Sequence, residues 1–173
     1  TFAQANLMNC YYEKQDFVNS EIYADKVLKN PKMDDKIKSD AQIIIARSAI
    51  KTNNDAKAKE AYAKLQKIAK GELAAEALYY DAYFKNKEGK FDASNKAVEK
   101  YSSTYSGYKY FGAKSLVVMA KNYYGLKDSF QATEILQSII DNFTEFPDVV
   151  TECQTELDKI KAEEAKTNSS VTK

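Results

Sequence analysis

Few residues of this chain are suited to catalysis or to metal binding. The 173 residues contain no histidine, so the commonest general base and the commonest metal ligand are missing. Cys10 and Cys153 lie at opposite ends of the sequence, and two distant cysteines cannot build a structural zinc site. Gly107 and Gly112 are too far apart for a phosphate loop and lack a following Lys-Ser or Lys-Thr. The remaining reactive groups are carboxylates, hydroxyls and ammonium groups.

Two adjacent carboxylate pairs, Asp34/Asp35 and Glu163/Glu164, could in principle perform acid–base chemistry. Neighbouring residues of a helix do not face one site, so we expect these groups to be solvated or to cap helices. A serine with no histidine and no convincing lysine partner gives no nucleophile. We therefore expect neither an enzyme nor a bound cofactor or metal.

The overall charge excludes two further classes of function. The chain has 26 basic and 25 acidic residues, and its net charge of +1 provides no basic face for nucleic acid or for an anionic membrane. The longest apolar runs, such as residues 43–46 and 116–120, are far shorter than the roughly 20 residues that span a bilayer. We expect no nucleic-acid binding and no membrane insertion. The chain begins at Thr1 and shows no signal peptide, which leaves the compartment open.

The apolar periodicity predicts an all-α protein. Gly is 5 and Pro is 2, too few for a sheet-rich fold with many tight turns. Breaks fall at Asn30-Pro31, at Gly71 and at Ser106-Gly107, and Pro147 suits the first turn of a last helix. The sequence predicts nine helices, at about 2–14, 16–29, 34–52, 55–69, 72–86, 90–104, 109–125, 128–142 and 146–165.

Two columns of small or slim residues repeat along these helices. The first is Met8, Ala46, Ala82 and Ala120, and the second, twelve residues later, is Ser20, Ala58, Ser94 and Ala132. Both columns step by 38, 36 and 38 residues, which is typical of a helical solenoid. The predicted repeats cover about 1–33, 34–70, 71–106 and 107–143 of a single solenoid domain, 1–165.

The last predicted helix differs from the repeats. It has an apolar stripe, Val149, Val150, Cys153, Leu157 and Ile160, and a charged face, Glu152, Glu156, Lys159, Glu163 and Glu164. This pattern is typical of a capping helix with one face on the last repeat and one in solvent. We expect residues 166–173 to be a disordered tail. The amino-terminal end shows no such cap, and we expect further repeats before it, so that the chain is the carboxyl-terminal part of a longer protein.

The positions of the cysteines in this array argue against a disulfide. Cys10 lies in the first repeat and Cys153 in the last helix, and each repeat of a solenoid contacts only its neighbours. We expect both to be buried small hydrophobes.

The repeat resembles the tetratricopeptide repeat (TPR) family. In that family helix A carries a large apolar residue, then a small one, then an aromatic three further on, as in Leu7-Met8-Tyr11 and Met119-Ala120-Tyr123. The third repeat departs from this pattern at Asp81 and Lys85, and the period exceeds the family's usual length, so we expect longer turns. The resemblance implies a right-handed superhelix of four helix-turn-helix repeats plus the capping helix. Tyr-rich repeats with long turns are similar to bacterial cell-envelope TPR proteins, which implies a periplasmic or envelope location, with the cytoplasm as the alternative.

The resemblance also implies a concave groove lined by the A helices. Carried over to this sequence, the groove positions are Ala5, Asn9, Tyr12, Glu13, Ile43, Arg47, Ile50, Lys51, Tyr79, Tyr83, Asn86, Val117, Lys121 and Tyr124. The tyrosines could line the groove as broad contacts with polar tips, or they could pack between repeats.

Some members of the family clamp the carboxyl end of a peptide with Lys, Asn and Arg residues. Of those positions only Asn9 matches, since Ala5, Ile44, Glu76 and Tyr80 occupy the others. We therefore expect no clamp.

The expected function is a non-catalytic scaffold that binds a protein or peptide segment through the concave helix-A surface. Docking of another subunit, or self-association, through the uncapped amino-terminal repeat is a further expected contact. The alternative is a structural spacer of a longer repeat protein, which contacts only adjacent repeats or subunits.

Overall fold

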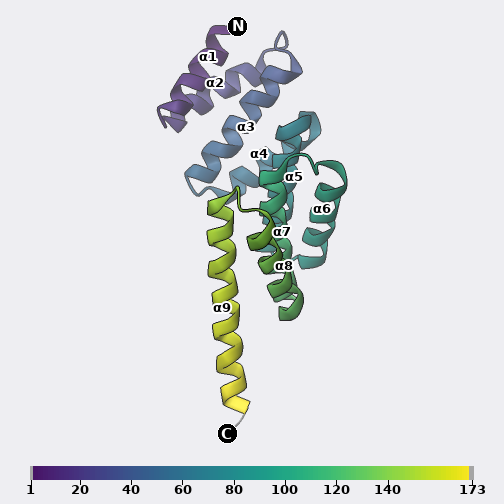
Figure 1. Cartoon of the computed structure of the whole chain (residues 1–173). Helices are drawn as coiled ribbons and strands as arrows, with labels where there is room; N and C mark the ends of the chain where they lie inside the picture. The colour runs from purple at the N-terminus through teal and green to yellow at the C-terminus, as the bar shows by residue number, and fades with distance from the viewer. Residues whose placement is uncertain (1, 172–173) are drawn as a thin grey trace. The chain divides into compact units, whose positions relative to one another are not determined.

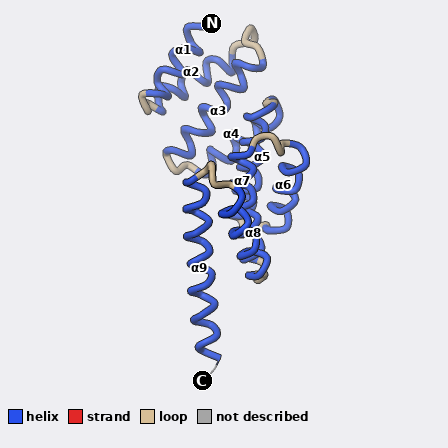
Figure 2. The backbone as a smooth tube through the Cα atoms, viewed as in Figure 1, coloured by secondary structure: helices blue, strands red, loops and turns tan. Residues whose placement is uncertain are grey.

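The computed structural model describes the backbone of residues 2–171 and the side chains of residues 2–168. These residues form nine α-helices and no strand, which confirms the predicted all-α class (Figures 1 and 2). The chain divides into two compact units, Thr1–Asp81 and Ala82–Lys173, and the boundary falls inside one helix, α5 (Gly71–Lys87). Among residues 2–171, no helix combines the length and the apolar composition that crossing a membrane requires.

The first unit consists of two helical hairpins and the start of α5. The hairpins are α1 (Phe2–Glu13) with α2 (Phe17–Lys29), and α3 (Asp35–Lys51) with α4 (Asp55–Ile68). The second helix of one hairpin packs on the first helix of the next, since α2 contacts α3, and α1 also touches α3. The side chains with no exposed surface include Met8, Ala24, Val27, Ala46 and Leu65.

The second unit repeats this arrangement with α6 (Phe91–Thr104), α7 (Lys109–Gly125), α8 (Ser129–Asn142) and α9 (Pro147–Val171). Each of these helices packs on the next, and α7 also contacts α9. One apolar cluster joins α7, α8 and α9; its buried members are Ala113, Val117, Ala120, Ala132, Leu136, Ile139, Val149, Cys153, Leu157 and Ile160. The predicted apolar stripe of the last helix is therefore its packing face, with Val150 half-buried at its margin.

Both predicted columns of small residues are buried. All eight side chains have 0% of their surface exposed: Met8, Ala46, Ala82, Ala120, Ser20, Ala58, Ser94 and Ala132. Small side chains let two helices approach closely. Where the second column carries serine, the hydroxyl donates a hydrogen bond to the carbonyl of the first column, 3.0 Å from Ser20 to Met8 and 2.7 Å from Ser94 to Ala82. The two columns are thus the contact between the helices of each hairpin.

The turn inside each hairpin has the same backbone geometry in all four cases. One residue takes a left-handed conformation, and these residues are Gln15 (φ 59°), Asn53 (φ 56°), Gly89 (φ 72°) and Lys127 (φ 68°). The next amide returns to the carbonyl five residues earlier, as from Asp128 to Tyr123 at 2.9 Å. This is the Schellman ending of a helix. Its recurrence at steps of 38, 36 and 38 residues shows that the period of the sequence is also a period of the backbone.

The residue after this turn starts the second helix of the hairpin. Asp16, Asn54 and Asp128 accept a hydrogen bond from the backbone amide three residues on, which is the usual N-cap. Lys90 holds the same place in the third hairpin without a side-chain cap. The predicted helix starts are within one or two residues of those observed, because the cap and the turn are both encoded locally.

Two features differ from the sequence-based expectation. The last helix continues to Val171 rather than ending at about 165, because no Gly or Pro interrupts it and Ala162–Lys166 are good helix formers. Residues 172–173 of the predicted tail lie outside the described residues. Cys10 is exposed, so its predicted burial is wrong, whereas Cys153 is buried as predicted.

The left-handed turn residues give a test of the backbone argument. A side chain in this conformation costs about 1–2 kcal/mol, which glycine avoids at some entropic cost in the unfolded chain. We expect Lys127→Gly to stabilise the protein by about 0.5–1 kcal/mol in urea unfolding. The matched control is Gly89→Ala, which should destabilise it by about 1 kcal/mol through the backbone alone, since nothing lies within 4 Å of an added Cβ there. Equal effects of both changes would contradict the assignment.

Candidate functional site

The predicted groove residues differ in how much surface they leave for a partner. Ile43, Tyr79 and Val117 are buried and belong to the interior of their units. Asn9, Glu13 and Lys51 are exposed on α1 and α3. The others are half-buried: Ala5, Tyr12, Arg47, Ile50, Tyr83, Asn86, Lys121 and Tyr124. Among these, Tyr12 and Arg47 lie near one another in the first unit, and Asn86, Lys121 and Tyr124 line one hollow in the second.

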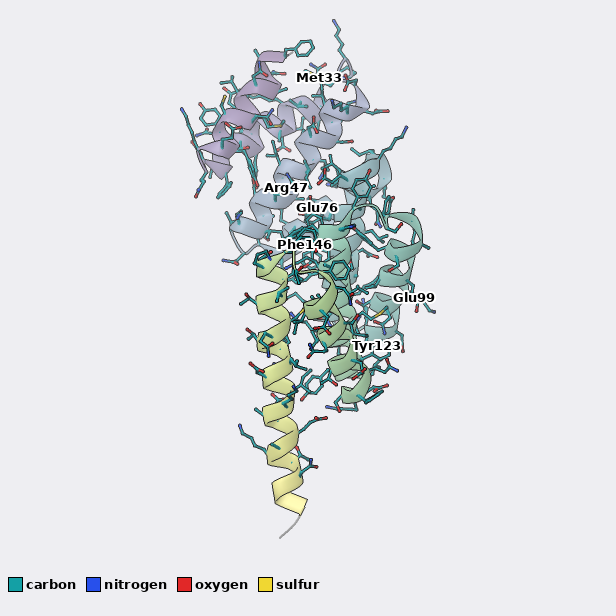
Figure 3. The ribbon with its side chains drawn as sticks, in the orientation of Figure 1. Met33, Arg47, Glu76, Glu99, Tyr123 and Phe146 are labelled. Atoms are coloured by element: carbon teal, nitrogen blue, oxygen red, sulfur yellow. The ribbon has the colours of Figure 1, made fainter. Side chains whose placement is uncertain are left out.

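In the first unit, Arg47 of α3 binds Glu76 of α5 through two parallel hydrogen bonds (Figure 3). Nε lies 3.0 Å from Oε1, and Nη2 lies 2.6 Å from Oε2. The glutamate side chain is 3% exposed and that of the arginine 42%. Bidentate charge-assisted pairs are among the stronger protein hydrogen bonds. The guanidinium is therefore held in one orientation from its buried side.

A third donor completes the pairing of the Glu76 carboxylate. The hydroxyl of the buried Tyr62 donates to Oε1 at 2.9 Å. The Tyr62 ring stacks on Tyr80 with 4.0 Å between ring centroids, and Tyr80 meets Tyr79 edge to face at 4.8 Å. A buried carboxylate needs such partners to offset the loss of water. Through Tyr62 the ion pair is thus joined to a cluster of three aromatic rings.

The electrostatics of this cluster raise the pKa values of Arg47, Tyr62 and Tyr12. The hydrogen bonds to Glu76 raise the pKa of Arg47 further above its usual range. Burial, and then the charge of Glu76, raise the pKa of Tyr62 well above its usual value. Burial also raises the pKa of Tyr12, against the opposing charge of Arg47. The guanidinium and both phenols therefore retain their protons near pH 7.

In the second unit, three predicted groove residues line one hollow of about 270 Å³. These three are Asn86, Lys121 and Tyr124. Residues of α9 also line the hollow, and the complete lining is Asn86, Lys121, Tyr124, Gly125, Leu136, Glu156, Lys159 and Ile160. The hollow therefore combines an apolar floor with polar groups at its rim, as ligand sites commonly do.

Lys121 is paired to α9 within this hollow. Its Nζ lies 2.8 Å from Oε1 of Glu152 and 3.6 Å from Oε1 of Glu156, and Lys114 lies 3.1 Å from the other oxygen of Glu152. Burial acts to lower the pKa of Lys121, but both glutamates outweigh it, so the pKa is raised. Burial likewise acts to raise the pKa of Glu152, and the two lysines outweigh it, so that pKa is lowered.

This pairing corrects the expectation that Glu152 and Glu156 form the solvent face of the capping helix. Both are half-buried against α7. Further pairs join the same two helices, since Tyr110 donates to Asp148 at 2.7 Å and Tyr124 donates to Glu163. In each pair the donor lies on α7 and the acceptor on α9. The polar face of the last helix is thus partly a docking face toward α7.

Asn86 is positioned by a buried amide network. Its side-chain amide donates to Asn122 at 2.8 Å, and Asn122, which has no exposed surface, donates in turn to Ser94 and Asn95, each at 2.8 Å. Buried polar groups that are fully satisfied give a site a single geometry. The network fixes Asn86 beside the hollow.

The sequence pattern does not predict Tyr62 and Asn122 as site residues. It predicts Glu76 only as a mismatch to the peptide clamp, and Glu152 as part of the solvent face of the last helix. The repeat period does relate the two glutamates to each other. Lys114 and Glu152 are 38 residues apart, as are Tyr110 and Asp148, so the period of the repeats continues into α9. Glu76 lies six residues before Ala82 of the first column. Glu152 lies six residues before position 158, where a further step of 38 residues from Ala120 would place that column. The burial of Tyr62 and Asn122 depends on helices distant in sequence, which no local pattern reveals.

Comparison with known proteins gives no family assignment, because no protein-family model and no curated protein matches this chain. Within the described part of the chain, no three His, Cys, Asp or Glu side chains are grouped so that they could hold a metal ion. The two clusters provide fixed donors, acceptors and aromatic surface. They can therefore orient a bound polar chain.

The Arg47–Glu76 pair predicts a specific pattern of mutational effects. In Arg47→Met the buried carboxylate keeps only Tyr62 as a partner; breaking a buried pair costs several kcal/mol, and the partial exposure of Arg47 reduces this to about 1.5–3 kcal/mol. We expect this loss in denaturant unfolding. Adding Glu76→Gln should recover at least half of it, because the uncompensated charge is gone.

The control for this pair is Lys51→Met, which removes an exposed cation from the same helix and should change stability by less than about 0.5 kcal/mol. Equal losses for the two single variants, or a double variant worse than Arg47→Met, would show that Glu76 does not depend on the guanidinium.

The lowered pKa of Glu152 predicts an acid-dependent contribution to stability. A carboxyl whose folded pKa lies below its ordinary value of 4.5 stabilises the fold above that pH and loses this contribution as pH falls through the folded value. Thermal unfolding between pH 7 and pH 3 should therefore decline less steeply in Glu152→Gln than in the parent. The exposed Glu134→Gln on α8 is the control and should follow the parent curve. Parallel curves for all three proteins would refute this contribution.

Proposed function

We propose that this chain is a non-catalytic protein-interaction scaffold of the tetratricopeptide type. Its helical hairpins form a right-handed superhelix, and its A helices, α1, α3, α5 and α7, hold an extended peptide segment of a partner protein. The resemblance extends this proposal to a location in a bacterial cell envelope.

The observation that carries the proposal is a repeated, immobilised cation. Arg47 and Lys121 each follow a buried alanine of the first column, and each is held by a glutamate of a neighbouring helix, Glu76 or Glu152. Both cations remain partly exposed. Donors that are already fixed cost less entropy when a ligand binds.

The groups around these cations match the chemistry of a peptide backbone. Glu76 occupies Nε and Nη2 of Arg47, so Nη1 is left to donate to a carbonyl or carboxylate of the partner. In the second unit the hollow places Asn86 and Tyr124 near an apolar floor that includes Leu136 and Ile160. A segment with alternating polar contacts and an apolar side chain would satisfy this site.

A structural spacer is the second candidate, and one observation favours it. The same ion pairs connect α3 to α5 and α7 to α9, so they stabilise the packing of these alternate helices even when no partner is bound. In this reading the cations need no ligand.

A peptide-display selection against the intact chain distinguishes the two functions. The enriched peptides should bind at least tenfold more weakly, about 1.4 kcal/mol, to Tyr12→Ala and Tyr124→Ala, with little change in the thermal midpoint, because both side chains keep exposed surface at the two clusters. The matched control is Phe130→Ala, which removes an aromatic ring that is 70% exposed on α8.

Two outcomes would count against the scaffold and for the spacer. One is a selection that enriches no sequence. The other is a pair of tyrosine variants that bind as the parent does, or that lose binding only in proportion to their loss of stability.

A further inference from the structure

The amino-terminal helix exposes an apolar face. Leu7 is 40% exposed and Phe2 is 78% exposed, and Ala3 and Cys10 are exposed as well. Ala3, Leu7 and Cys10 follow one another at spacings of four and three residues, so they share one side of α1. These three residues are called the open face of α1.

The period of the chain shows what the open face corresponds to elsewhere. The positions equivalent to Ala3 are Ala41, Ala77, Ser115 and Cys153; those equivalent to Leu7 are Ile45, Asp81, Met119 and Leu157; those equivalent to Cys10 are Ser48, Phe84, Asn122 and Ile160. Ten of these twelve side chains are buried, and Asp81 and Met119 are half-buried. Only in α1 are all three positions exposed.

On α3, α7 and α9 the second helix of the preceding hairpin packs on the helix that carries these positions. Within the two units α2 packs on α3, α6 on α7 and α8 on α9. The α9 residues Cys153, Leu157 and Ile160 share one apolar cluster with α8 residues, among them Leu136 and Ile139. Figure 1 shows α2 and α3 beside α1 in the first unit. The covering helix is thus a recurrent part, and α1 lacks it among the described residues.

The opposite end of the chain is built differently. Continuing the period from α7 to α9 replaces Ala113, Leu116, Val117, Ala120 and Tyr123 by Thr151, Gln154, Thr155, Asp158 and Lys161. The α7 residues are members of the cluster with α8 or pack against it, whereas their α9 counterparts are all exposed. The outer face of α9 is therefore polar where no helix covers it. The open face of α1 carries no such substitution, so it retains the chemistry of a covered face.

We propose that the open face of α1 docks an amphipathic helix belonging to another helical hairpin. The open face carries no charge, so the docking helix must present an uncharged stripe of small and branched aliphatic residues, as α8 does with Ala132, Leu136 and Ile139. Charged residues on that stripe would be desolvated without a partner. This surface is separate from the peptide site and does not depend on it.

A second copy of the chain is a poorer occupant on the same grounds. In helices equivalent to α1 this face packs against the second helix of a hairpin, and in this chain α2, α6 and α8 already pack in that way on α3, α7 and α9. The outer face of α9 is polar and offers no apolar stripe. The proposed occupant is therefore a helical hairpin from outside residues 1–173.

The test adds such a hairpin and reads the exposure of Cys10. Phe2 and Glu152 occupy the same position of the period, so a copy of residues 109–151 joined directly before Phe2 continues the register. We expect the reaction of Cys10 with N-ethylmaleimide in the folded chain to slow at least tenfold. Cys153 is the internal reference, because it is buried and burial raises its pKa to about 11. The added copy contains no cysteine.

Two substitutions in the fused chain make the result specific. Leu7→Glu places a charge on the open face and should restore the fast reaction of Cys10. Ile22→Glu is the matched control, since Ile22 is an exposed apolar residue of α2 whose equivalents are the charged Glu60, Lys96 and Glu134; it should leave Cys10 protected. Both side chains are exposed in the parent chain, so neither change endangers its folding.

A second fusion guards against a hairpin that fails to fold. It joins a copy of residues 2–39, with Cys10→Ser in the copy, before Phe2 in the same register. Protection of Cys10 in either fusion supports the proposal, and an unchanged rate in both overturns it. A parent chain that sediments as a dimer, and as a monomer after Leu7→Glu, would also overturn it in favour of a second copy. None of these readouts involves peptide binding, so they are independent of the scaffold test.

Discussion

The close contact between the two helices of each hairpin is the constraint on which the rest of the structure depends. It requires a small or slim residue at two positions, and all eight such residues are without exposed surface. The left-handed turn that recurs at the same spacing brings the helices together with these positions opposed. Once this contact is fixed, the direction in which each of the other side chains points from its helix is fixed as well. The residue directly after the first column must then point away from the hairpin contact, and it is at this position that Arg47 and Lys121 occur.

The ion pairs of these two cations act on geometry more than on stability. A buried pair recovers little more than the cost of removing its charges from water, and apolar residues of similar volume often serve stability equally well. The Glu76 carboxylate nevertheless accepts three hydrogen bonds from Arg47 and Tyr62. Hydrogen bonds are directional, so apolar contacts could not orient the guanidinium in the same way. Lys121 and Glu152 repeat the arrangement in the second unit. This recurrent interaction specifies how α3 is placed against α5 and α7 against α9, and it fixes the positions of the two cations.

Sequence reasoning succeeded where the determining interactions are local or strictly periodic. The helix limits follow from caps and turns, and the buried columns follow from the 38- and 36-residue steps. It failed where the determining neighbour lies one repeat away. The roles of Glu152 and Glu156 require the period to be continued into α9, and the exposure of Cys10 requires knowing that none of the described helices covers that side of α1. The stacking of Tyr62 on Tyr80 and the burial of Asn122 follow from packing across hairpins, which a single sequence does not encode locally.

The two proposed binding surfaces use different sides of the same kind of helix. The peptide site uses the position after the first column, which on α1 is Asn9, whereas the docking face uses Ala3, Leu7 and Cys10. Adjacent helical residues point about 100° apart, so Asn9 and Cys10 address different neighbours. A hairpin that covers Cys10 therefore leaves Asn9 accessible. In the proposed scaffold it would also add a further A helix, with its own position after the small column, so that end docking would lengthen the proposed peptide-binding surface rather than compete with it.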